Sequence, residues 1–228
     1  MAIKGYIFDY GGTLDTGGDH WGKVIWHAYQ HHQIPVTEEQ YRDAYVYAER
    51  TLGRQPIIQP DFTFRQTLEA KVSLQLQHLG LWNTECDEDI AHALVDTLYA
   101  RTQAQTVHSR EVLLRLKARY PLVLVSNFYG NIGIVLREFG LDDLFQTVIE
   151  SAVVGVRKPD PRIFMLGVEA LGVRPDEVAV VGDSIDKDIL PARQTGCYTV
   201  WFQGEPWTDE PIDHTIPDQT ITDLTELM

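Results

Sequence analysis

Five short apolar runs constrain the fold of this chain more than any other feature. They predict buried β-strands over residues 3–9, 121–126, 146–150, 178–183 and 198–202. Helical patterns separate the later runs, and the pattern that follows residues 121–126 stops at Gly140. Strands that alternate with helices in this way predict an α/β fold built on a doubly wound parallel sheet.

The stretch between the first two apolar runs has a different sequence pattern. Helical patterns predict four helices there, near residues 20–33, 37–52, 62–80 and 87–105, and no convincing strand pattern interrupts them. We therefore expect a helical cap domain over residues 17–105, inserted directly after the first strand. The α/β core then comprises residues 1–16 and 106–228, with the cap above the carboxyl ends of its strands.

The charge balance narrows the classes of partner. The chain has 228 residues and a formal net charge of −14. Such acidity disfavours nucleic acid and anionic membranes as main partners. Cys86 and Cys197 lie far apart and lack the spacing of metal ligands, which favours packing roles in a reducing compartment. Because no apolar segment reaches membrane-spanning length and no signal-peptide pattern is evident, the sequence predicts a cytoplasmic protein.

Residues able to do chemistry fall near the carboxyl ends of four predicted strands. They are Asp9, Ser126 with Asn127, Lys158, and Asp183 with Asp188. Because α/β sheets bind ligands at this edge, we expect the side chains to converge there. Taken alone, Lys158 is typical of a solvated surface lysine, and Asp183 is typical of a helix cap. Their combination and order favour a single site.

In these motifs the sequence resembles the haloacid dehalogenase-like (HAD) superfamily, specifically members with a helical cap inserted after the first strand. The resemblance spans essentially the whole chain and implies a Mg²⁺-dependent hydrolase of a small phosphorylated metabolite. It implies that Asp9 is the nucleophile and that Ser126 and Lys158 hold the transferring phosphoryl group. The implied metal ligands are Asp9, the backbone carbonyl of Gly11, Asp183 and, in preference to Asp186, Asp188. The phosphate site is expected to include Gly12, Thr13, Ser126, Asn127 and Lys158.

The residue types make chemical sense of this assignment. A carboxylate that attacks phosphorus forms an aspartyl-phosphate, which divides one difficult hydrolysis into two easier steps. Because Asp9 and a phosphate repel each other, a bridging Mg²⁺ is expected, and this ion prefers oxygen ligands such as Asp9 and Asp183. Lys158 would supply a point charge for the phosphoryl oxygens.

The sequence departs from the family pattern at Gly11. Family phosphatases carry a second Asp at this position, which protonates the leaving oxygen and later activates water. Glycine does neither. General acid–base help is worth about 10²–10⁴-fold in rate, so we expect weak phosphatase activity unless another group substitutes. Asp15, Asp19 and His20, in the connection to the cap, are the candidates for that substitution.

Two other functions stay open. The protein could bind a phosphorylated ligand without turnover, as a regulatory module. It could also resemble phosphonoacetaldehyde hydrolases, which have a small residue at the position of Gly11 and use a Schiff-base lysine from the cap. Lys23 and Lys71 are the cap lysines of this chain. A dehalogenase is disfavoured, because the metal-binding Gly-Asp pair at residues 182–183 is retained.

The cap also offers candidate specificity residues. The turn at Gly53 and Arg54 is the predicted specificity element, since it interrupts the helical pattern of the cap. Arg54 and Arg65 could grip a second anionic group of a substrate.

Overall fold

The computed structural model describes residues 2–82, 85–208 and 211–228, with the backbone alone over residues 85–87. Six parallel strands form one sheet in the order β3-β2-β1-β4-β5-β6. They are β1 (Gly5–Phe8), β2 (Leu122–Ser126), β3 (Thr147–Glu150), β4 (Val178–Gly182), β5 (Tyr198–Phe202) and β6 (Gln219–Ile221). The five predicted strands are confirmed. The edge strand β6 is too short to show a strand pattern in the sequence.

Strand β1 lies inside the sheet and fixes the place of the site. It pairs with β2 and β4, so that Phe8 lies opposite Leu124 on one side and Val181 on the other. The backbone N–H of Asp9 extends this pairing by donating to the Val181 carbonyl at 3.0 Å. As a result, the residues that end β1, β2 and β4 leave the sheet at the same edge.

Alternation of side chains along the strands explains why both faces of the sheet are covered. Ile7 belongs to the apolar cluster packed around α7 (Arg162–Leu171), whereas Phe8 belongs to a larger cluster on the opposite face. That larger cluster includes residues of the long helix α4 and of the cap. The remaining core helices are α5 (Ile132–Glu138), α6 (Ser151–Val154) and α8 (Leu190–Gln194). The predicted doubly wound α/β architecture is confirmed.

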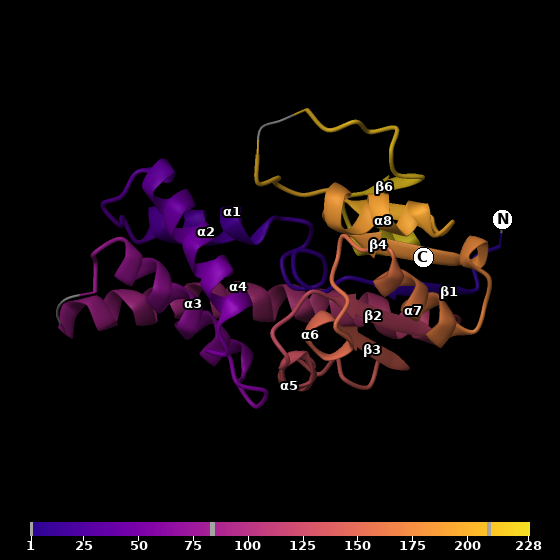
Figure 1. Cartoon of the computed structure of the whole chain (residues 1–228), viewed down its shortest axis with the longest axis horizontal. Coiled ribbons are helices and arrows are strands. Elements are labelled where there is room, and N and C mark those ends of the chain that lie inside the picture. Colours follow the sequence, from indigo (N-terminus) through magenta and orange to yellow (C-terminus); the bar gives the residue numbers. More distant parts are fainter. Residues whose placement is uncertain (1, 83–84, 209–210) are drawn as a thin grey trace.

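The predicted cap helices are present beside the sheet. They are α1 (Trp21–His31), α2 (Glu38–Arg54), α3 (Phe64–His78) and the first part of α4 (Glu85–Lys117). In Figure 1 the indigo-to-purple helices α1–α3 lie to the left of the strands, and α4 runs from the cap to the sheet. Capping boxes at Thr37 and Thr63 satisfy the first N–H groups of α2 and α3 and so set where these helices begin.

Helix α4 joins the two parts of the chain. The helix predicted to end near residue 105 continues to Lys117, because no glycine or proline interrupts residues 85–117. The added turns bury Val112, Leu113 and Leu116 in the cluster beneath the sheet. The expected boundary between residues 105 and 106 therefore falls inside a helix rather than in a linker.

Two further sequence expectations concern the chain as a whole. In the part of the chain that the structure describes, no helix combines the length and the apolar character needed to cross a membrane. Cys197 is buried, and the Thr195 hydroxyl donates to its Sγ at 3.2 Å, as expected of a packing residue. The side chain of Cys86 lies outside the described residues.

Candidate active site

Three carboxylates converge at the carboxyl edge of the sheet. Asp9 directly follows β1, Asp183 directly follows β4, and Asp188 lies in the π-helical turn Ile185–Ile189. One carboxylate oxygen of each acid lies within 4.8 Å of the others. Asp186, the alternative to Asp188, is exposed and lies outside this group. The three converging acids can therefore share one cation.

Lys158 is buried between two of these acids rather than solvated. Its Nζ donates to Asp9 Oδ1 at 2.6 Å and to Asp188 Oδ1 at 2.7 Å, and its side chain is only 3% exposed. Asn127 holds the lysine backbone from both sides. The Asn127 amide donates to the Lys158 carbonyl at 3.0 Å and accepts from the Lys158 N–H at 2.9 Å. Asn127 thus positions the ammonium as well as bordering the site.

The charges of this cluster do not balance among the protein groups. Burial raises the pKa of Asp9 to about 6, with Lys158 opposing the shift and Asp188 supporting it. Burial and the charges of Asp188 and Asp9 raise the pKa of Asp183 well above its usual range. Three carboxylates and one ammonium leave two negative charges in excess when all are ionised. A divalent cation would cancel them, and an all-oxygen donor set fits Mg²⁺.

The loop after β1 holds the carboxylates of Asp183 and Asp15 in place. The Thr13 hydroxyl donates to Asp183 Oδ1 at 3.0 Å and accepts from the Asp183 N–H at 3.1 Å. Gly12 has φ +101°, and an added Cβ would lie 2.4 Å from Asp183 Oδ2, so only glycine fits. The Gly12 N–H donates to Asp15 Oδ1 at 2.7 Å. The structure therefore uses Gly12 and Thr13 to hold acids, and neither residue borders the cavity over Asp9.

Neither the backbone conformation nor the packing at position 11 requires glycine. Its φ lies outside the left-handed region, and an added Cβ would meet only Trp21 Cδ1 and Nε1, both at 4.0 Å. That distance is ordinary van der Waals contact. Gly11 also borders the cavity above Asp9. A side chain at this position would therefore fit and would face the site.

Asp15, one predicted substitute for the missing acid, is held away from this cavity. It is 1% exposed, and its carboxylate accepts hydrogen bonds from the Gly12 N–H at 2.7 Å and from Trp21 Nε1 at 2.9 Å. Burial raises the pKa of Asp15 to about 7. The pKa suits proton transfer, but the carboxyl does not border the cavity in which a leaving group would lie.

The other two predicted substitutes have structural partners as well. Asp19 accepts from Arg101 at 2.5 Å and from the Glu205 N–H at 2.7 Å. His20 does border the cavity, but its Nδ1 accepts from the Gly22 N–H at 3.0 Å at the start of α1. Burial lowers the pKa of His20 to about 4, so the imidazole is neutral at pH 7 and is a weak proton donor.

A cavity of about 560 Å³ lies over Asp9, a size suited to a small metabolite. At its floor, the Ser126 hydroxyl has no hydrogen-bond partner among the residues that the structure describes, so it is available to a ligand. The walls come from α2 and from loops that the sequence patterns did not single out. They include Tyr45, Glu49, Arg50, Tyr129, Arg157, Lys187 and Trp207, together with the predicted Gly53 and Arg54.

An ion pair between buried Lys71 and half-buried Glu49 connects α2 and α3 beside this cavity. Lys71 Nζ lies 2.7 Å from Glu49 Oε1, and the Tyr129 hydroxyl donates to Glu49 Oε2 at 3.0 Å. Burial alone would lower the pKa of Lys71, but Glu49 raises it above its usual range, so the amine stays protonated. Lys23 is bonded to Glu38 at 3.2 Å. Neither lysine borders the cavity, so the geometry does not support a Schiff-base role for them.

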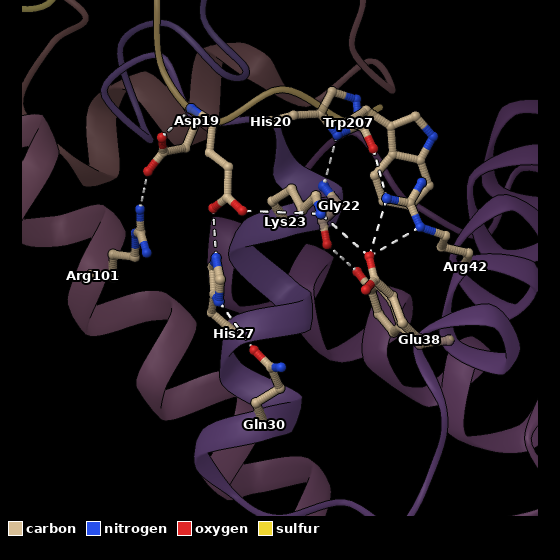
Figure 2. A network of polar contacts seen from close by, with 12 residues as sticks. Asp19, His20, Gly22, Lys23, His27, Gln30, Glu38, Arg42, Arg101 and Trp207 are labelled. Carbon is tan, nitrogen blue, oxygen red and sulfur yellow. Dashed lines mark hydrogen bonds and ion pairs between the residues drawn. The ribbon is translucent and has the colours of Figure 1, made fainter. Parts of the chain in front are cut away.

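The segment after β5 contacts the cap, as Figure 2 shows. Trp207 packs against His20, with 5.1 Å between ring centroids, and lies 4.2 Å from the Arg42 guanidinium. Arg42 Nη2 also donates to the Trp207 carbonyl at 2.8 Å. An added Cβ at Gly22 would lie 2.1 Å from Trp207 Cζ3. The indole therefore forms a wall of the cavity because a glycine stands in the first turn of α1.

Arg65 does not take part in the site. Its Nη2 lies 2.7 Å from Asp96 Oδ1, and its guanidinium lies 4.9 Å from the Tyr99 ring centroid. It does not border the cavity over Asp9. The structure therefore pairs Arg65 with a cap carboxylate and does not bring it to the cavity, so the expectation that it grips a substrate anion stays without support.

Several curated proteins with similar sequences are named as phosphatases. The chain is 37% identical over 124 residues to glyceraldehyde 3-phosphate phosphatase of Pyrococcus furiosus, covering 53% of this chain and 51% of that protein. It is 40% identical over 88 residues to phosphoserine phosphatase of Thermus thermophilus, covering 39% of this chain and 34% of that protein. The chain thus spans about half or less of the length of these relatives.

Solved structures support the fold over the full length. The HAD-hydrolase YfnB of Bacillus subtilis, bound to magnesium, matches 100% of this chain and 97% of its own with TM-score 0.59 and 18% identity. A HAD phosphatase of Thermococcus onnurineus matches with TM-score 0.53 and 22% identity, over 99% of this chain and 96% of its own. The family model described as haloacid dehalogenase-like hydrolase matches residues 3–196. Together with the converging acids and the buried lysine, this match shows that the chain belongs to the haloacid dehalogenase-like hydrolase family.

Proposed function

We propose that this protein is a Mg²⁺-dependent phosphatase of small phosphorylated metabolites that carries the phosphoryl group on Asp9. One observation supports this most strongly. Asp9, Asp183 and Asp188 place oxygens within 4.8 Å of one another, and Lys158 Nζ lies 2.6 Å from Asp9. Relatives named as phosphatases of glyceraldehyde 3-phosphate and phosphoserine support a small substrate. The cavity volume of about 560 Å³ is compatible with one.

The residues of the site have distinct roles in the proposed reaction. Asp9, the Gly11 carbonyl, Asp183 and Asp188 would hold Mg²⁺, which supplies positive charge to the phosphoryl oxygens when bound. An Asp9 oxygen attacks phosphorus, and the bond between phosphorus and the leaving oxygen breaks as the new bond forms. Lys158 Nζ and the Ser126 hydroxyl donate to the non-bridging oxygens. Water then attacks the phosphoryl group, which releases inorganic phosphate and restores the Asp9 carboxylate.

Proton transfer is the weak part of this scheme. The leaving oxygen needs a proton in the first step, and the attacking water must lose one in the second. Gly11 offers no group for either transfer, Asp15 does not border the cavity, and His20 is neutral. We therefore propose slow turnover, with solvent water exchanging the protons, and faster reaction for esters whose leaving groups are already acidic.

The lack of an acid–base group at Gly11 favours a second candidate function. A site that holds Mg²⁺ and a phosphate but lacks the acid–base group would bind a phosphorylated ligand long before it hydrolysed one. Gly11 has room for a side chain and carries none, so packing does not force this loss. A regulatory phospho-ligand-binding protein is therefore the alternative to a slow enzyme.

A phosphate-release screen distinguishes the two functions. Purified protein is incubated with a broad panel of phosphate monoesters, with Mg²⁺ or with EDTA, over hours. The phosphatase proposal expects Mg²⁺-dependent release that Asp9→Asn abolishes. The binding alternative expects thermal stabilisation by a monoester with Mg²⁺ and no release above the Asp9→Asn background. Release that survives both EDTA and Asp9→Asn would rule out this site as its source.

A further inference from the structure

Four cationic side chains without partners border the cavity over Asp9. They are Arg50, Arg54, Arg157 and Lys187. Among the residues that the structure describes, none of the four has a hydrogen bond or ion pair with another side chain or with the backbone. All four are exposed. This places unneutralised positive charge at one opening of a chain whose formal net charge is −14.

The other cationic side chains of the protein have partners, in contrast to these four. Every other lysine and arginine has a hydrogen bond or an ion pair with a described residue. Most of these contacts are short, such as the Arg65–Asp96 pair at 2.7 Å and the Arg110 bond to the Gly140 carbonyl at 2.8 Å, and among the longest are the Arg137–Asp142 pair at 3.9 Å and the Arg115 contact with Met228 Sδ at 4.0 Å. In a chain with 33 acidic residues against 19 basic ones, partners for a cation are plentiful. Cations left unpaired in one place therefore indicate a site that holds an anion from outside.

The one cap carboxylate that borders the cavity does not neutralise them. Glu49 is bonded to Lys71 at 2.7 Å and to the Tyr129 hydroxyl at 3.0 Å. Although burial alone would raise it, the Lys71 ammonium and these hydrogen bonds, with a smaller contribution from the charge of Lys187, hold the pKa of Glu49 below its usual range. Its charge is therefore matched by Lys71. Arg50 and Arg54, one helical turn apart on α2, remain free to face a ligand.

The transferring phosphoryl group does not account for these cations either. It would lie at Asp9, where Lys158 supplies positive charge and a bound divalent cation would add to it. Arg50 and Arg54 belong to α2 of the cap, whereas Asp9 and Asp183 follow strands of the sheet. Arginine suits planar carboxylates and phosphates, because its guanidinium can donate two parallel hydrogen bonds.

We infer that the ligand of this cavity carries a second anionic group, a carboxylate or a phosphate, besides the phosphoryl group at Asp9. Arg50 and Arg54 of the cap bind that group, and Arg157 and Lys187 complete the positive rim. This assignment rests on the proposed function, since it takes the Asp9 end of the cavity as the phosphoryl site. It makes Arg50 and Arg54 specificity residues of this chain.

Binding measurements on a protein that cannot turn over test the inference. Three probes share a phosphate monoester and differ in the tail: ethyl phosphate is uncharged there, 2-phosphoglycolate has a carboxylate, and 1,2-ethanediol bisphosphate has a phosphate. Their affinities for Asp9→Asn are measured by calorimetry with Mg²⁺ at fixed ionic strength. We expect at least one charged probe to bind about tenfold tighter than ethyl phosphate, and the tighter probe identifies the second group.

Substitutions assign the preference to residues. Arg50→Gln combined with Arg54→Gln should weaken the preferred charged probe about tenfold or more and ethyl phosphate less than twofold. Arg65→Gln, which removes a cap arginine paired to Asp96 away from the cavity, is the matched control and should change neither affinity. Equal weakening of all three probes would mean general attraction of anions and would overturn the inference. Equal affinity of the starting protein for all three would overturn it as well.

The outcomes separate this inference from the proposed function. If wild-type protein hydrolyses ethyl phosphate as fast as the charged probes and the glutamine variants change nothing, the inference is wrong and the phosphatase proposal stands. If no probe is hydrolysed, yet the charged tails still bind about tenfold tighter through Arg50 and Arg54, the phosphatase proposal is wrong and the second anion site stands.

Discussion

Replacing Gly11 by Asp would restore the group whose loss dominates the proposed chemistry. The backbone permits this change, because φ at Gly11 lies outside the left-handed region and the new Cβ would lie 4.0 Å from the nearest atoms of Trp21. The neighbouring glycine does not permit it, since a Cβ at Gly12 would lie 2.4 Å from Asp183. Gly11→Asp is therefore expected to fold with the active-site loop unchanged.

The expected size of the gain follows from general acid–base catalysis. Such a group contributes about 10²–10⁴-fold, which corresponds to about 3–5 kcal/mol of barrier. Trp21 Nε1, 4.0 Å from the new Cβ, already donates to Asp15, so no partner holds the new carboxyl toward the leaving group and we expect the lower end, about 10²-fold. The variant also adds a negative charge beside acids that already have two in excess. Its stability should therefore depend more strongly on Mg²⁺ than that of the wild type.

The assay compares kcat for one slow monoester in wild type, Gly11→Asp and Gly11→Asn. The Asn variant has nearly the same shape and cannot transfer the proton. A gain confined to Asp supports the reasoning, and it should disappear in the double variant with Asp9→Asn. Equal gains in the Asp and Asn variants would refute it, because the effect would then come from packing. An Asp variant that binds Mg²⁺ normally and gains nothing would refute it too.

Three further predictions concern stability, each measured by urea unfolding. Lys158→Met leaves two buried carboxylates without their cation, so in EDTA at pH 8 it should lose about 3–5 kcal/mol; an unchanged unfolding midpoint would contradict the buried pairing. The pKa of His20 is lowered from 6.5 to about 4, so its neutral form stabilises the fold and wild type should lose up to about 3 kcal/mol relative to His20→Asn as pH falls from 6.5 to 4. A constant difference across that range would mean that the partly buried surroundings of His20 do not lower its pKa. Gly22→Ala should displace Trp207 and destabilise the protein by about 1–3 kcal/mol, whereas Gly133→Ala, with open space around its Cβ and a helical position, should stabilise it by about 0.5–1 kcal/mol.

The sequence determined the framework of this protein. Strands buried on both faces of a parallel sheet must be nearly continuous in apolar residues, and so residues 121–126 and 178–183 could be recognised without neighbours. The position of Asp9 at the end of such a run already placed it at the ligand-binding edge. The departure at Gly11 was equally visible, because the missing side chain is a local property of the chain.

The tertiary structure decided which charged side chains have ion-pair or hydrogen-bond partners and which have none. Lys158 taken alone was typical of a surface lysine, and Arg65 was a candidate to bind a substrate, yet Lys158 is bonded to two buried acids and Arg65 to Asp96. The structure also showed that the Thr13 hydroxyl donates a hydrogen bond to Asp183, 170 positions away. No local pattern reports such pairings, because the energy of a charge depends on burial and on partners brought close by folding. The absence of partners for the four cations over Asp9 is likewise a property of the folded chain, because partners are set by proximity in space.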